Sequence, residues 1–101
     1  MIDVTVHVVE CAFGKVRYLR ETDLADADLE TVIRDLAAGQ FDHPRRVIAF
    51  NTAEGWAREV SEDIAREVAE RAWHDGDTLS EGARSFCERH GIVLPGAVAA
   101  E

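Results

Sequence analysis

The spacing of apolar residues changes along this chain of 101 residues, and that change limits the folds open to it. Over residues 2–9 apolar side chains alternate with polar ones, the apolar set being Ile2, Val4, Val6 and Val8. Alternation of β-branched residues predicts a strand with that one face buried. From Leu29 onward the apolar residues recur every three or four positions, which predicts helices. We therefore expect an α+β fold.

The first half of the chain is predicted to hold two strands, a helix and a third strand. Residues 1–20 read as a β-hairpin that turns at Gly14. A helix follows from about residue 26 to residue 38, with acidic side chains suited to its N-terminus. The segment 45–51 is continuously apolar at its centre, which favours a central strand or one covered on both faces.

The second half is predicted to be helical. Asn51 or Thr52 would cap a long amphipathic helix that ends near Gly76, with apolar residues at every fourth position: Trp56, Val60, Ile64, Val68 and Ala72. The segment 78–81 reads as a capping box that starts a third helix, ended by Gly91. Residues 95–101 are expected to be a frayed tail.

The predicted order is therefore β-β-α-β-α-α within a single domain, residues 1–101. A right-handed crossover through the first helix would set the second and third strands parallel, with the first strand between them and antiparallel to both. The expected architecture is a small three-stranded mixed sheet with the helices packed on one face.

The predicted helices and the predicted strands differ in charge. The chain has 20 acidic and 11 basic residues and a net charge of −9, which disfavours direct binding to nucleic acid. Segments 21–35 and 54–75 account for −5 and −4, whereas residues 1–20 sum to +1. The simplest interpretation is a solvated helical surface whose charge keeps the protein soluble. The alternative is a two-faced protein, with acidic helices that could meet a basic partner and a basic sheet that could dock another copy or an anion.

The chain shows no sign of export or membrane insertion. Its first residues lack a basic segment, and no apolar run approaches the length needed to span a bilayer. The two cysteines, Cys11 and Cys87, are expected to be reduced thiols. The predicted location is the cytoplasm.

Motifs for catalysis or metal binding are weak. Cys87 and His90 have a spacing that could place them one helical turn apart, but a zinc site needs further ligands. Cys87 falls on an apolar helix face, so a buried structural thiol is the favoured interpretation. We predict no catalytic residues, no metal and no cofactor, and the chain is more consistent with a binding protein than with an enzyme.

Two sets of residues remain as candidate sites. Asn51, Thr52 and Trp56 lie where a strand is expected to enter a helix, and free N–H groups there could bind a polar ligand. Ordinary capping with a core Trp is the simpler interpretation. Trp73, Arg17 and Arg45 are candidate interface residues, because Trp is enriched at interfaces and the arginines lie on the expected sheet.

Three segments resemble a group of short, uncharacterised bacterial proteins: residues 31–36 (TVIRDL), 39–41 (GQF) and 46–56 (RVIAFNTAEGW). The resemblance covers about residues 21–69. It implies a bacterial cytosolic origin and carries over no activity, cofactor or site residue.

These observations lead to three functional hypotheses. The first is a small acidic, non-enzymatic binding or regulatory protein that acts through protein–protein contacts, including a homodimer. The second is an inhibitor that uses helix carboxylates as a decoy for nucleic acid. The third is a small-molecule binder or enzyme that uses the corner at residues 51–56.

Overall fold

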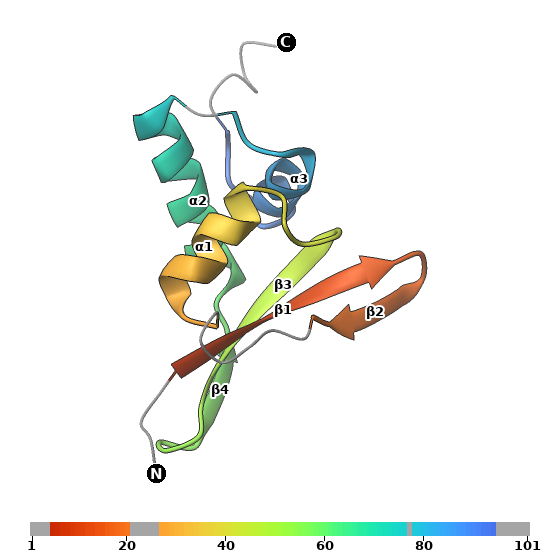
Figure 1. The fold of residues 1–101 in the computed structure, drawn as a ribbon, viewed down its shortest axis with the longest axis vertical. Coiled ribbons are helices and arrows are strands. Elements are labelled where there is room, and N and C mark those ends of the chain that lie inside the picture. The colour runs from red at the N-terminus through yellow and green to blue at the C-terminus, as the bar shows by residue number, and fades with distance from the viewer. Residues whose placement is uncertain (1–4, 21–26, 77, 95–101) are drawn as a thin grey trace.

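The computed structural model describes residues 5–20, 27–76 and 78–94 and confirms an α+β fold (Figure 1). In chain order its elements are β1 (Thr5–Phe13), β2 (Val16–Leu19), α1 (Leu29–Ala37), β3 (Pro44–Asn51), β4 (Trp56–Glu59), α2 (Ser61–Asp75) and α3 (Glu81–Arg89). The described part of the chain therefore has the order β-β-α-β-β-α-α, with one strand more than predicted.

The four strands form one sheet in the order β2-β1-β3-β4, which curls into a half-barrel. β1 is antiparallel to both β2 and β3, so the predicted position of the first strand is confirmed. The predicted mixed, three-stranded sheet is wrong. β2 and β3 run in the same direction, but β1 separates them, so every neighbouring pair in the sheet is antiparallel.

The missed strand, β4, occupies the start of the predicted long helix. Asn51 accepts a hydrogen bond from the backbone N–H of Glu54 on its side-chain oxygen (2.8 Å) and from that of Gly55 on its carbonyl (2.8 Å). Gly55 has φ +74°, in the left-handed region that glycine adopts without strain. These bonds close a hairpin turn, after which Trp56 pairs with Asn51 across the β3–β4 ladder. An Asn followed by Glu three residues later is compatible with a helix cap and with this turn, and here it forms the turn.

One buried cluster joins the sheet to all three helices. Its largest fully buried members include Val9 of β1, Val47 of β3, Leu36 of α1, Val68 of α2 and Phe86 of α3. In Figure 1 the helices lie together, and the two hairpins extend beyond them. The prediction that the helices cover one face of the sheet agrees with this cluster.

The face of β1 that contacts the helices is the opposite of the predicted one. His7, Val9 and Cys11 point toward the helices and are buried, and a His7 ring nitrogen lies 3.1 Å from the carbonyl oxygen of Ala27. Val6 and Val8 alternate with them and lie on the other face. The polar His7 is accepted inside because its ring has a buried hydrogen-bond partner.

Local signals place the helix ends well. Asp28 caps α1 and accepts a hydrogen bond from the N–H of Thr31 (3.1 Å), so the helix begins three residues later than predicted. Ser80, and not Thr78 at the start of the predicted capping box, caps α3 by accepting a hydrogen bond from Ala83 N–H. The expected close at Gly91 is confirmed as a Schellman motif, because Ile92 N–H reaches the carbonyl of Cys87 (3.0 Å). Residues 21–26 and 95–101, including the predicted tail, lie outside the described residues.

Gly39 offers a test of this packing. It has φ +78°, and a Cβ placed there would lie 3.0 Å from the Cβ of Ser80. Gly76 has a similar φ of +69° but open space around it. We expect Gly76→Ala to lower the free energy of unfolding by about 1 kcal/mol, the cost of the left-handed conformation. Gly39→Ala should cost more, because Ser80 at the start of α3 must also move. Urea denaturation measures both, and equal losses would contradict the proposed contact.

Candidate protein interface

The face of the sheet that carries no helix is apolar at its centre. Val6 and Val8 of β1 lie opposite Phe50 and Ile48 of β3, and all four side chains are half-buried. Ala57 of β4 pairs with Phe50, so it extends the row formed by Val6 and Phe50 onto the next strand. None of these five residues belongs to the cluster beneath the helices. We call Val6, Val8, Ile48, Phe50 and Ala57 the helix-free patch.

Such a patch is unusual for an antiparallel sheet with one covered face. The uncovered face of such a sheet is normally polar, which produces a clean alternation along each strand. Here β3 is apolar on both faces, since Val47 and Ala49 point to the helices while Ile48 and Phe50 do not. Contiguous exposed apolar surface is typical of interaction sites.

An ion network borders the helix-free patch. The Arg46 guanidinium binds the Glu10 carboxylate with two hydrogen bonds, Nε to Oε1 at 3.1 Å and Nη2 to Oε2 at 2.7 Å. Its third nitrogen, Nη1, lies 3.8 Å from the Glu59 carboxylate. The three residues come from β1, β3 and β4, so the network ties the strands together across the same face.

The Glu10 carboxylate is held in its charged form by this network. The hydrogen bonds from Arg46 are the main reason that the pKa of Glu10 is lowered from its ordinary value, with burial opposing them. Glu10 is only 8% exposed, and its partner compensates the cost of burying its charge. The pairing orients Arg46 and leaves a defined polar border beside an apolar centre.

The β1–β2 hairpin adds exposed apolar and basic side chains. Phe13 is 78% exposed and pairs with Val16 at the tip, and Tyr18 and Leu19 of β2 are also exposed. Arg17, a predicted interface residue, is exposed on the same strand. The β1–β2 hairpin therefore presents exposed apolar and basic side chains at one edge of the sheet.

The predicted ligand corner has a different structure from the one expected. Asn51 is 3% exposed, its amide nitrogen donates to Thr5 Oγ1, and its oxygen holds the turn. Thr52 is exposed in that turn. Trp56 donates its ring N–H to Glu54 (2.9 Å), and the Arg58 guanidinium lies 5.0 Å from its ring centre. The turn's own contacts therefore occupy the N–H groups of Glu54 and Gly55, and no helix begins there to supply others.

The predicted interface residues fall into two groups. Burial is the main reason that the pKa of Arg45 is lowered, and the positive charges of Arg89 and Arg17 lower it further. Trp73 is 68% exposed on the last turns of α2, beside a shallow cavity of about 310 Å³ that Leu79 and Leu94 also line. Figure 1 places that end of α2 far from β2. The structure therefore sets Trp73 apart from the two arginines.

Both cysteines are free and buried. The Cys87 thiol donates to the carbonyl of Ala65 (3.4 Å), and burial raises its pKa to about 11. A ring nitrogen of His90 lies 2.7 Å from the carbonyl oxygen of Arg45. Within residues 5–20, 27–76 and 78–94, no group of three or more His, Cys, Asp or Glu side chains is arranged to hold a metal ion. The helices in these ranges are too short or too polar to cross a membrane.

The helix-free patch was not identified from the sequence, although its signal was present. Residues 47–50 form a continuous apolar run, which implies that both faces of that strand are apolar. The helices were expected to cover one face only. Taken together, these two expectations imply an uncovered apolar face on the other side.

No protein-family model, curated protein or solved structure matches this chain. The resemblance to short bacterial proteins therefore stays a prediction, and the function has to be argued from the geometry.

The ion network can be tested through pH. Because folding lowers the pKa of Glu10, its contribution to stability is present above its ordinary pKa and is lost as the pH falls through the lowered folded value. We expect Glu10→Gln to lower the free energy of unfolding at about pH 7 and to have a smaller effect at about pH 3. Denaturant titrations at both pH values measure this difference.

Glu62→Gln is the matched control, because Glu62 pairs with Arg66 on the exposed surface of α2. Exposed pairs of this kind contribute little, so this variant should be close to wild type at both pH values. A Glu10→Gln effect of equal size at both pH values would contradict the role given to the network.

Proposed function

We propose that this protein is a non-enzymatic binding protein that acts as a homodimer, with the helix-free patch as the contact between the two copies. The observation that carries the proposal is the apolar composition of the sheet face opposite the helices. A cytoplasmic location, where the protein would meet protein partners, belongs to the same proposal.

A second copy of this chain offers the same apolar face. Two copies of the curled sheet can place these faces against each other across a twofold axis. Val6, Val8, Ile48 and Phe50 would then meet their own equivalents, which is the self-complementary contact that twofold symmetry requires. Sheets packed in this way bury both inner faces in one shared core.

The charges at the edges of the sheet are also complementary under such symmetry. Arg17 lies on the edge strand β2, opposite Ala12 in the register, and Glu59 lies on the other edge strand, β4. A twofold axis along the strands would lay β2 of one copy over β4 of the other. Arg17 would then approach the side that carries Glu59, and such pairing favours one orientation of the dimer.

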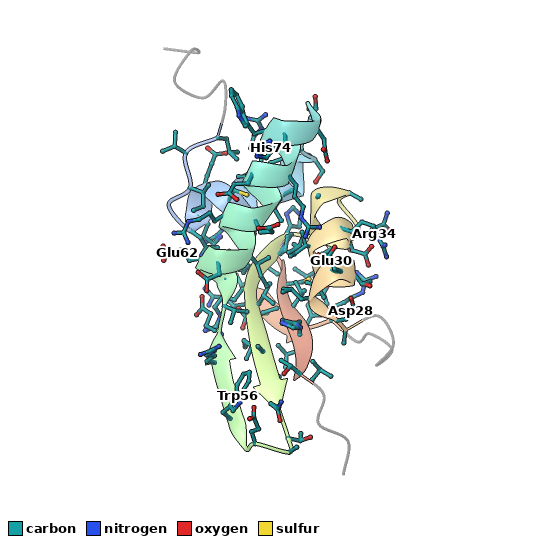
Figure 2. The ribbon with its side chains drawn as sticks, turned by 90° about the vertical axis from the view of Figure 1, so that its left-hand side faces the viewer. Asp28, Glu30, Arg34, Trp56, Glu62 and His74 are labelled. Atoms are coloured by element: carbon teal, nitrogen blue, oxygen red, sulfur yellow. The ribbon has the colours of Figure 1, made fainter. Side chains whose placement is uncertain are left out.

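The helices would remain on the outside of this dimer, and they carry nine of the 20 acidic residues. Figure 2 shows Asp28 and Glu30 on α1 beside α2, which carries Glu62 near its start. This surface is available to a basic protein partner. The dimer would thus use its sheets for self-association and its helices for a second contact.

The acidic decoy has less support than the binding protein. Arg71 pairs with both Glu30 of α1 and Glu67 of α2, and Arg66 pairs with Glu62 and Asp63. Guanidinium groups therefore interrupt the row of carboxylates that an imitation of a phosphate backbone needs. The small-molecule site at Asn51, Thr52 and Trp56 also has less support. It was predicted from a helix start at that corner, and the structure has a strand there, with α2 beginning at Ser61.

Replacement of Ile48 by Glu tests the proposed contact. The wild-type protein should sediment as a dimer, and Ile48→Glu should raise the dimer Kd by about 30-fold or more, the effect of losing a central interface residue. The far-UV circular dichroism spectrum should not change, because Ile48 lies outside the buried cluster. Val8→Lys, on the neighbouring strand, should give the same result.

Two exposed apolar residues elsewhere provide controls. Val93→Glu and Trp73→Glu alter side chains that are 74% and 68% exposed, and both variants should remain dimeric. A strictly monomeric wild-type protein at high micromolar concentration would overturn the proposal. A dimer that Trp73→Glu dissociates and Ile48→Glu leaves intact would move the contact to α2.

A further inference from the structure

A cavity of about 540 Å³ lies between the turn end of the β1–β2 hairpin, the loop before β3 and the start of α3. Its walls include Gly39, His43, Arg45, Ser80, Gly82 and Arg89. The cavity is separate from the helix-free patch, with which it shares no residue.

Two guanidinium groups, those of Arg45 and Arg89, line this cavity. Burial, followed by the positive charges of Arg89 and Arg17, lowers the pKa of Arg45, and the charge of Glu10 opposes this shift. No described carboxylate lies within ion-pair distance of Arg45 or Arg89, whereas Arg46, Arg66 and Arg71 are all paired. The protein as a whole has a net charge of −9, but these positive charges create a local positive potential that attracts an anion.

The start of α3 adds hydrogen-bond donors at the same wall. Ser80 accepts from Ala83 N–H, which leaves its own hydroxyl hydrogen free to donate outward. The positive end of the α3 dipole lies at Ser80, Glu81 and Gly82. A Cβ at Gly82 would lie 3.6 Å from Pro44 Cδ, so this glycine lets the loop before β3 pack against the start of α3.

The loop that forms the opposite wall is held in an uncommon conformation. His43 has φ +44°, the one positive φ among the described residues other than glycine. Its carbonyl accepts a hydrogen bond from Ala12 N–H (3.1 Å), which ties the loop to β1. A non-glycine residue in this region costs energy and is found most often where a site needs a particular backbone shape.

Two carboxylates also line the cavity and limit what it can bind. They belong to Asp42 and Glu81, both exposed, and neither is among the charges that shift the pKa of Arg45. The cavity is therefore basic only around Arg45 and Arg89. The two carboxylates would repel a ligand with several negative groups, so the cavity suits a ligand with one compact anionic group.

We propose that Arg45 and Arg89, together with the N-terminus of α3, bind a single phosphate group in this cavity. Two guanidinium forks and a helix N-terminus match the oxygen geometry of phosphate better than that of a carboxylate, because phosphate offers more acceptor oxygens. The site does not depend on the proposed dimer, since it uses none of the residues of the helix-free patch.

Titration with inorganic phosphate, followed by amide NMR at constant ionic strength, tests this site. We expect saturable shifts centred on Gly82 and Ser85 and about tenfold weaker binding in both Arg45→Gln and Arg89→Gln. Arg89 is exposed on the last turn of α3, so its variant should fold even if Arg45→Gln does not. Arg66→Gln, which removes a paired arginine on α2, should bind as the wild type does.

Parallel titrations with phenyl phosphate and acetate identify the ligand chemistry. Tighter binding of phenyl phosphate than of inorganic phosphate would support a site for phosphate esters, and equal binding would support one for free phosphate. The proposal is overturned if acetate binds as tightly as phosphate. It is also overturned if the shifts do not saturate, or if they are unchanged in the Arg89→Gln variant.

Discussion

A single buried cluster, closed between one face of the sheet and three helices, is the constraint on which the rest of this structure depends. Phe86 and Leu36 are almost fully buried against Val47, and burial of each such side chain stabilises the fold by about 1.5–3 kcal/mol. All three helices contribute to this cluster. Among the described residues none is left to cover the other face of the sheet, although β1 and β3 are apolar there as well.

Much of the fold could be predicted because its signals are local. The Schellman close at Gly91 depends on a few neighbouring residues, and so does the cap of α1 at Asp28. β4 could not be separated from α2 in the same way. Trp56 and Val60 precede Ile64 at intervals of four residues, as they would in a helix, although Trp56 lies in a strand. The turn at Asn51 also resembles a helix cap in sequence.

The candidate sites were harder to predict because they depend on which face of each strand meets the helices. Alternation along β1 shows two faces but does not say which is covered, and here the face with His7 is buried. The choice depends on Ala27, 20 residues away, which meets the His7 ring. Arg45 and Arg89 likewise meet at one cavity from two separate elements, β3 and α3, and no spacing in the sequence predicts this.

The exposed strand β2 bears on how far this protein can assemble. β2 lies at the edge of the sheet, and an edge strand can add strands from other copies without limit. Lys15, Arg17 and Arg20 place three positive charges along this edge. Two copies that met through β2 on both sides would bring these charges against each other, which opposes that pairing. In the proposed dimer, contact through the sheet faces is complete with two copies, and the basic hairpin would disfavour the addition of further copies through β2 to β2 contacts.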